Sequence, residues 1–289
     1  MSTRASCVLL TKRFLTVARL AIAAFIGLSV SGFSSHAQSL PSGMQSVGLF
    51  EIDRTEVSIA EFRRFVQSTG MRTQAERAGG GSTYEGGWQQ RPGWVWHAPF
   101  GQPGGDREPV AHVNHHEAEA FCRWAGKRLP TDAEWGEAAY SERRALPTGP
   151  LRQGQSYPYP TGDSPQGANC LGDCGTVATV AAAQTSRGQG HALVGSTRAG
   201  VNGLFEMGGN LWEWVDSGPG AEKRTRGGSW WYGAFNMKAE VQAFKPADFY
   251  AVYIGFRCAY DGALLSPVPP SITPPVPQSR PQPSTQVTR

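Results

Sequence analysis

Three segments rich in glycine and tryptophan constrain the fold of this chain more than any other feature. They are residues 201–214 (VNGLFEMGGNLWEW), 226–231 (RGGSWW) and 255–258 (GFRC). The whole sequence shares this bias, because 36 of its 289 residues are Gly, 21 are Pro and 9 are Trp, while only 17% are charged. Such a composition favours a loop-rich globule held together by aromatic side chains over a helical bundle or a disordered chain.

The first 37 residues have the pattern of an export signal. Basic residues precede an apolar run from Leu20 to Val30, and Ser35-His36-Ala37 offers a cleavage site between small residues. The run of about 11 residues is too short for a stable membrane-spanning helix. We therefore expect a cleaved signal peptide over residues 1–37, no stable membrane span and a periplasmic location.

Charge and cysteine content narrow the class of protein further. The net charge of +4 is spread along the chain without a basic cluster, which argues against nucleic-acid binding. Beyond the signal, the chain has Cys122, Cys170, Cys174 and Cys258. An even number in an oxidising compartment predicts two disulfides, but the sequence alone does not choose among the three pairings. A metal or redox pair at Cys170 and Cys174 is the weaker alternative, because no second pair completes a tetrahedral set.

Local patterns predict several helices and strands. Residues 49–53 alternate as a strand does, and a short strand is also expected over residues 109–113. Ser58 and Thr131 each precede a glutamate by three residues, which predicts two capping boxes at helix starts, and Asn114 is a third expected N-cap.

The remaining regions set the expected domain limits. Residues 38–46 have the composition of a flexible leader, residues 141–200 are expected to be mostly irregular, and residues 263–289 form a proline-rich tail. We expect this tail to be extended and without fixed structure. One domain over residues 47–262 therefore holds nearly all of the mature chain.

The three opening segments, together with residues 120–139 (AFCRWAGKRLPTDAEWGEAA), resemble the formylglycine-generating enzyme family, also called sulfatase-modifying factors. The resemblance implies an α+β, loop-rich fold with little regular secondary structure, distantly like C-type lectins. It also implies a disulfide between Cys122 and Cys258. Cys170 and Cys174 would then close a short loop.

One departure from the family pattern bears directly on chemistry. Copper-dependent members have cysteines three and eight positions after the serine of the GGS turn, and here Tyr232 and Met237 occupy those positions. Paired thiolates hold Cu(I) because sulfur is a soft ligand, and a phenol with a thioether does not replace them. We therefore expect no copper and no copper-dependent formylglycine formation.

The resemblance also implies a structural calcium ion. The matching ligands are Glu206 and Glu213 through their carboxylates, and Gly209 and Leu211 through their carbonyl oxygens. Calcium binds six to eight oxygen atoms, and these groups would supply a good share. Glu206 replaces a shorter Asp or Asn of the family. The alternative is that Glu213 pairs with an arginine beneath the tryptophans.

A substrate groove is expected around the GGS turn. Ser229 and Tyr232 are the candidate catalytic or positioning residues, and Trp230, Trp231 and Phe235 are the candidate stacking residues for a flat small molecule or a peptide. The equally weighted alternative is that these tryptophans only fill the core. Glu240, Lys245 and Asp248 are candidate proton-transfer groups, and the sequence does not select among them.

The histidines form a second cluster in the sequence. His112, His115 and His116 lie close to Glu117, a combination typical of metal sites. Because His115 and His116 would point about 100° apart on a helix, we expect surface or hydrogen-bonded histidines and no metal centre. The alternative is that two of the three converge with His97 or His191 on an iron ion, as in sulfoxide-forming members of the family that the chain resembles.

Three functions compete. The first is an exported tailoring enzyme that oxidises a substrate other than a sulfatase, similar to the family member that acts in maturation of the siderophore pyoverdine. The second is a non-catalytic periplasmic accessory or binding protein, for example for a copper enzyme. The third, formylglycine generation on sulfatases, conflicts with the missing thiols.

Overall fold

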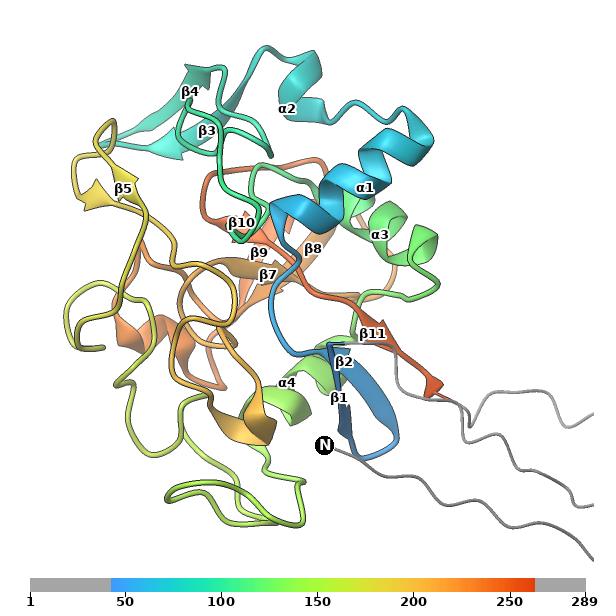
Figure 1. Cartoon of the computed structure of the whole chain (residues 1–289), viewed down its shortest axis with the longest axis vertical. Helices are drawn as coiled ribbons and strands as arrows, with labels where there is room; N and C mark the ends of the chain where they lie inside the picture. Colours follow the sequence, from blue (N-terminus) through green and yellow to red (C-terminus); the bar gives the residue numbers. More distant parts are fainter. Residues whose placement is uncertain (1–42, 263–289) are drawn as a thin grey trace, which may run out of the picture. The chain divides into compact units, whose positions relative to one another are not determined.

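The computed structural model describes residues 43–262 (Figure 1). Short helices and short strands are joined by long connections, which confirms the predicted α+β, loop-rich fold. The helices are α1 (Ile59–Thr69), α2 (Gln74–Arg77), α3 (His115–Trp124) and α4 (Asp132–Tyr140), with short 3₁₀ helices η1 (Val201–Gly203) and η2 (Ala234–Met237). The predicted signal peptide, residues 1–37, and the predicted tail, residues 263–289, lie outside the described residues.

The first sheet brings together the two ends of the described chain. It has the order β1 (Met44–Val47), β2 (Phe50–Asp53) and β11 (Ala259–Tyr260), all antiparallel. The strand predicted over residues 49–53 is thus confirmed. The flexible leader predicted up to residue 46 is wrong from Met44 onward, because Met44 and Val47 are buried and pair with β2.

The second sheet takes part of each glycine- and tryptophan-rich segment into its strands. Its order is β10 (Ile254–Gly255), β7 (Trp212–Trp214), β8 (Glu222–Arg226) and β9 (Ala243–Pro246). Only the β10–β7 pair is parallel. Two hairpins complete the strands: β3 (Gly80–Tyr84) with β4 (Trp88–Pro92), and β5 (Ala181–Ala182) with β6 (Gly188–Gln189).

Each predicted helix start is capped as expected. Ser58 and Thr131 accept hydrogen bonds from the backbone of Glu61 and Glu134, and both capping boxes are complete. Asn114 caps α3 and forms a further capping box with Glu117. The strand predicted over residues 109–113 is wrong, because His112 adopts a left-handed backbone conformation with φ of 56°. The chain therefore bends just before α3.

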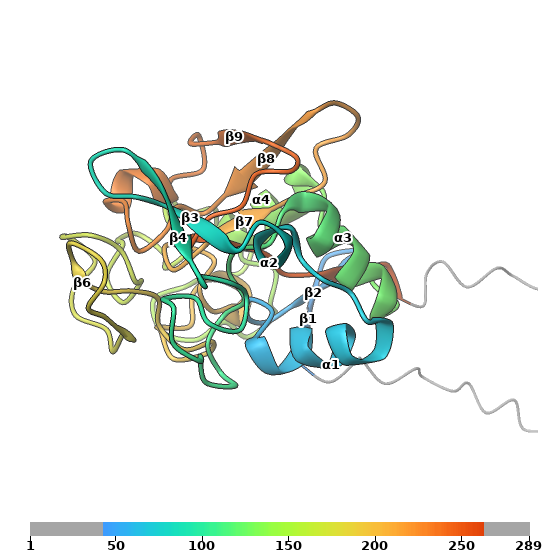
Figure 2. The same ribbon diagram turned by 90° about the horizontal axis from the view of Figure 1, so that it is seen from above.

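Helices α1 and α3 lie side by side, as both views show (Figure 2). The rings of Phe62 and Phe121 stack between them with centroids 5.7 Å apart. The core beneath them also includes Trp214 and Phe256, both fully buried. Such offset aromatic packing supplies the apolar burial that this loop-rich chain needs.

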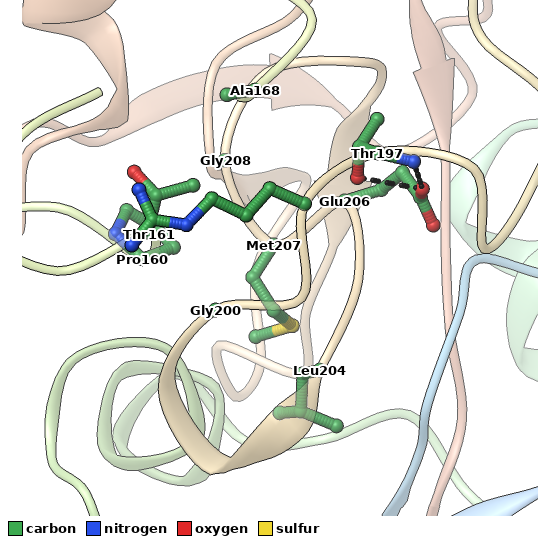
Figure 3. Close-up of a pocket in the computed structure, with 10 residues that line it drawn as sticks. Pro160, Thr161, Ala168, Thr197, Gly200, Leu204, Glu206, Met207 and Gly208 are labelled. Atoms are coloured by element: carbon green, nitrogen blue, oxygen red, sulfur yellow. Dashed lines mark hydrogen bonds between the residues drawn. The ribbon is translucent and has the colours of Figure 1, made fainter. Parts of the chain in front are cut away.

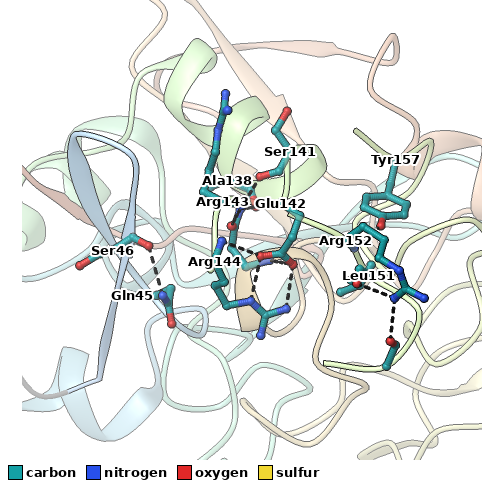
Figure 4. Close-up of polar contacts among 12 residues, drawn as sticks. Gln45, Ser46, Ala138, Ser141, Glu142, Arg143, Arg144, Leu151, Arg152 and Tyr157 are labelled. Carbon is teal, nitrogen blue, oxygen red and sulfur yellow. Dashed lines mark hydrogen bonds and ion pairs between the residues drawn. The ribbon is translucent and has the colours of Figure 1, made fainter. Parts of the chain in front are cut away.

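The long irregular region after α4 is tied to the core by one buried carboxylate. The side chain of Glu142 is fully buried, and both its oxygens accept hydrogen bonds from Arg144 at 2.8 and 2.9 Å (Figure 4). It also accepts from the backbone of Asn202 in η1. A buried charge is stable here because all these donors satisfy it.

Two disulfides close the structure. Cys122 of α3 is bonded to Cys258 before β11, and Cys170 is bonded to Cys174, so both predicted pairings are confirmed. Within residues 43–262, no helix combines the length and the apolar character that crossing a membrane requires.

Candidate functional site

An aromatic cluster surrounds Tyr232 at the edge of the second sheet. Tyr232 packs edge-on against Trp212, with ring centroids 5.8 Å apart, and against Tyr253 at 6.1 Å. Tyr253 stacks on Trp231 and also contacts Trp88 of β4. We call this set the aromatic cluster; it consists of Tyr84, Trp88, Trp212, Trp231, Tyr232, Phe249 and Tyr253.

The outer members of the aromatic cluster face solvent. Trp88 is 55% exposed and Tyr84 is 41% exposed, whereas Tyr253 is fully buried beneath them. Trp231 and Tyr232 are half-buried. The cluster therefore combines a packed base with accessible ring faces, which is the arrangement that binds flat ligands by stacking.

Arg187 adds a positive charge to the aromatic cluster. Its guanidinium carbon lies 3.9 Å from the ring centroid of Trp231, and it donates to the backbone oxygen of Trp231. Arg187 lies between β5 and β6, and the adjacent backbone of Ser186 donates to Glu85 in the β3–β4 turn at 3.1 Å. The two hairpins thus meet beside the cluster, as their neighbouring positions in Figure 1 illustrate.

The hydroxyl groups of Tyr232 and Tyr253 are protonated at neutral pH. Burial raises the pKa of Tyr232, and the nearby Arg187 only partly opposes the shift. Burial, followed by Tyr232 and Tyr84, raises the pKa of Tyr253 further. The Tyr253 hydroxyl has no hydrogen-bond partner among the described residues. Both phenols can therefore serve as hydrogen-bond donors but not as bases.

The other candidates from the GGS turn lie elsewhere. Ser229 is buried, and its hydroxyl accepts from the Trp231 backbone at 3.3 Å, so it shapes the turn. Trp230 is 2% exposed and packs against Phe100 in the core. Phe235 is 63% exposed and lies near Lys238 rather than in the aromatic cluster. Of the predicted stacking residues, only Trp231 lies in the aromatic cluster.

Met237 occupies a sulfur-rich part of the core. It is fully buried, and its Sδ lies 3.9 Å from Sγ of Cys174. Because Cys174 is bonded to Cys170, the sulfur atoms here are a thioether and a disulfide. Neither is a thiolate, so the chemistry of these donors does not fit a bis-thiolate copper centre.

Glu213 forms a buried ion pair with Arg257. Its oxygens accept from Nε and Nη2 of Arg257, both at 2.7 Å, and one also accepts from Nε1 of Trp135 at 2.8 Å. Both side chains of the ion pair are fully buried. This is the arginine pair that the sequence left open as the alternative to calcium.

Glu206 is also saturated by protein donors. Its carboxylate accepts from the backbone of Gly195 and Thr197 and from the Thr197 hydroxyl, at 2.8 to 3.1 Å (Figure 3). The two carboxylates of the predicted calcium site are therefore both engaged. In this arrangement the residues do not present the free oxygen cage that calcium requires, and calcium stays a prediction.

Sequence reasoning missed Glu56, which organises the segment between Glu206 and Glu213. Glu56 is fully buried and accepts from the Asn210 side chain and from the Leu211 backbone. Burial and the charges of Glu213 and Glu206 raise its pKa well above the usual range. Glu56 lies in the segment between β2 and α1 and carries no motif, so only the fold brings it to this segment.

Arg187, Tyr84 and Tyr253 were also missed. Arg187 and Tyr84 lie in loop-rich regions without a recognisable pattern, whereas Tyr253 directly precedes β10 and its aromatic character was the available signal.

The proposed proton-transfer residues receive no support from geometry. Glu240 and Asp248 are exposed. Lys245 has a pKa lowered by burial and only a long contact with the Phe244 carbonyl.

Comparisons with known proteins identify the class of this chain. The family described as "Sulfatase-modifying factor enzyme 1-like domain" matches residues 25–262. Formylglycine-generating enzyme of Streptomyces coelicolor is 32% identical over 263 residues, covering 75% of this chain and 80% of the relative. The chain therefore belongs to the sulfatase-modifying factor family.

One further relative and one solved structure are also similar to this chain. "Inactive C-alpha-formylglycine-generating enzyme 2" of Mus musculus is 30% identical over 257 residues, covering 76% of this chain and 77% of the relative. The solved structure of PvdO from Pseudomonas aeruginosa aligns with a TM-score of 0.49 and 20% identity, covering 73% of this chain and 80% of that structure.

Proposed function

We propose that this protein is an exported tailoring enzyme that oxidises a substrate other than a sulfatase, with dioxygen as the electron acceptor. The substrate class is a flat aromatic small molecule, such as the chromophore precursor of a siderophore of the pyoverdine type, and the compartment is the periplasm. Membership of the sulfatase-modifying factor family supports the fold that such an enzyme would use. The phenol and thioether at positions 232 and 237 argue for a substrate chemistry different from that of copper-dependent relatives.

The observation that carries this proposal is the half-exposed aromatic cluster around Tyr232. Its most exposed ring, Trp88, suits stacking against a planar ligand, while Trp231 is already packed between Arg187 and Tyr253. The neutral hydroxyl of Tyr232 can donate a hydrogen bond that orients the ligand. Arg187, stacked on Trp231, favours a ligand with a negative or electron-rich edge.

The competing function is a non-catalytic accessory or binding protein that uses the same aromatic cluster. It is favoured by the lack of paired thiols, since all four cysteines of residues 43–262 are in disulfides. The 30% identity to a relative described as inactive also supports it. Formylglycine generation on sulfatases is the least favoured function, because no cysteine of the described residues is a free thiol that could bind copper.

The test is the absorbance of a dihydro-aromatic siderophore precursor incubated with the purified protein under air. We expect wild type to change the spectrum and Tyr232→Phe to slow the change by roughly tenfold, as expected for the loss of one orienting hydrogen bond. Tyr260→Phe, in β11 of the other sheet, is the matched control and should behave as wild type.

Each remaining outcome selects a different function. Saturable binding of the precursor without turnover would overturn the catalytic proposal in favour of an accessory protein. Conversion of a sulfatase-derived CxPxR peptide to its formylglycine form would instead establish formylglycine generation. An equal effect of Tyr232→Phe and Tyr260→Phe would remove the proposed role of the aromatic cluster.

A further inference from the structure

A group of metal-ligating side chains lies at the start of α3, outside the aromatic cluster. Ligand atoms of His115, His116 and Glu119 all lie within 4.8 Å of one another, and no other such group occurs in residues 43–262. His115 and Glu119 are four residues apart and share one face of the helix. The two imidazole rings are edge-on, with centroids 5.9 Å apart. The expectation of a surface or hydrogen-bonded histidine is met by the exposed His116 but is wrong for His115, which is buried without a hydrogen-bond partner.

His115 is buried without the hydrogen bonds that a structural histidine normally makes. It is 4% exposed, and neither ring nitrogen has a partner among the described residues. His112, by contrast, bonds to the Pro99 carbonyl at 3.0 Å, and His191 bonds to Glu108 at 2.9 Å. A buried polar group without partners is costly unless a ligand satisfies it.

Packing fixes the ring of His115. The ring is held edge-on against Trp214, with centroids 5.7 Å apart. The orientation of His115 is thus fixed by packing, as a metal-binding imidazole requires.

A cavity of about 160 Å³ lies against His115 and Glu119, whereas His116 is not among its lining residues. Its walls are formed by His115, Glu119, Arg123, Arg128, Leu129 and Asp216. Asp216 adds a second carboxylate to the wall. The cavity therefore has room for an ion with its water ligands, next to the unpartnered imidazole.

Two arginines line the cavity; one is held by carboxylates, and the other forms an ion pair that a metal ion can replace. Arg128 is held by Glu134 and Asp261. Arg123 pairs with Glu119 at 2.8 Å, but the two side chains are 62% and 41% exposed. Such an exposed pair is weak, so a metal ion can compete with Arg123 for the carboxylate.

We propose that His115, His116 and Glu119 bind a divalent transition-metal ion, with zinc as the best-fitting representative. Two imidazoles, one carboxylate and a water complete a tetrahedral zinc shell, and this mixture of nitrogen and oxygen ligands disfavours calcium. Tetrahedral zinc ligands lie about 3.3 Å apart, so the side chains must close by up to about 1.5 Å. His116 is exposed and free to make this adjustment.

Titration calorimetry of the untagged chain with zinc chloride tests this proposal. We expect one ion to bind per chain, and Glu119→Gln and His116→Gln each to weaken binding by at least tenfold, because each removes one of three protein ligands. Both positions are partly or fully exposed, so neither substitution should affect folding. Cobalt gives a second readout, because tetrahedral nitrogen and oxygen ligation produces visible absorption that the variants should lose.

The matched control is His97→Gln, which removes a half-exposed histidine near Glu76. This variant should bind zinc as wild type does. The proposal is overturned if wild type binds no zinc at micromolar concentration. It is also overturned if the Glu119 and His116 variants retain full affinity, or if His97→Gln loses as much as they do.

Discussion

At the scale of single residues, Glu213 shows how one buried carboxylate can accept hydrogen bonds from several side chains of the core. Arg257 and Trp135 donate to it, while Glu56 and Glu206 influence the same arginine through their charges. Breaking a buried ion pair by removing one partner leaves the other charge without compensation. The residue is therefore a structural anchor, whatever the site nearby binds.

This role gives a prediction that separates the ion pair from calcium. Glu213→Gln should lower the free energy of unfolding by about 3 kcal/mol or more, because Arg257 stays buried without its counter-charge. Since Arg257 and Trp135 already donate to both carboxylate oxygens, denaturant titrations should give the same loss in calcium and in chelator.

A loss seen only in calcium-containing buffer would instead identify Glu213 as a calcium ligand. Glu222→Gln is the control, because Glu222 is an exposed residue of the adjacent strand β8. Its substitution should leave the free energy of unfolding nearly unchanged in both buffers.

At the scale of elements, the helices begin where their capping boxes place them. Asn114 is 5% exposed, and its side chain accepts from the Glu117 backbone at 3.0 Å, while the Glu117 carboxylate accepts from the Asn114 backbone N–H at 3.0 Å. The left-handed turn at His112 directs the chain into this cap. The start of α3 therefore fixes the position of His115.

Removing this cap should destabilise the protein measurably. Asn114→Ala should cost about 1 to 2 kcal/mol of unfolding free energy, because it leaves a backbone N–H of α3 without its acceptor. Chemical denaturation monitored by far-ultraviolet circular dichroism measures the loss. Asn114→Ser should recover most of it, since serine is also a good N-cap; an equal loss in both variants would contradict the capping role.

At the scale of the whole molecule, the two disulfides contribute very differently. Cys122 and Cys258 are 136 residues apart and join α3 to the segment before β11, whereas Cys170 and Cys174 are only 4 apart. A cross-link stabilises mainly by restricting the unfolded chain, and a longer loop loses more freedom. The long-range bond is thus the main covalent restraint on the described fold.

Serine replacements should reveal this difference. Replacing both Cys122 and Cys258 should lower the unfolding free energy by about 5 kcal/mol, and replacing both Cys170 and Cys174 by about 2 kcal/mol, from the loop lengths. Thermal and denaturant unfolding of the two double variants measure the gap. Equal losses would show that native packing around the sulfur atoms, and not loop closure, governs their contribution.

The sequence by itself determined the features that depend on neighbouring residues. The capping boxes at Ser58 and Thr131, the strand near residue 50 and the loop-rich character follow from local propensity and composition, and the structure confirms them. The family resemblance added both disulfide pairings. Local rules failed at His112, where tertiary packing holds a left-handed conformation within a segment that reads as a strand.

Only the tertiary structure decided which side chains share a site. Arg187, Tyr84 and Tyr253 come from separate segments to join Tyr232, whereas Trp230, adjacent to Trp231 in the chain, turns into the core. Glu213 likewise pairs with Arg257, which lies 44 residues away in the sequence. Burial and charge pairing act through space, so no pattern along the chain specifies them.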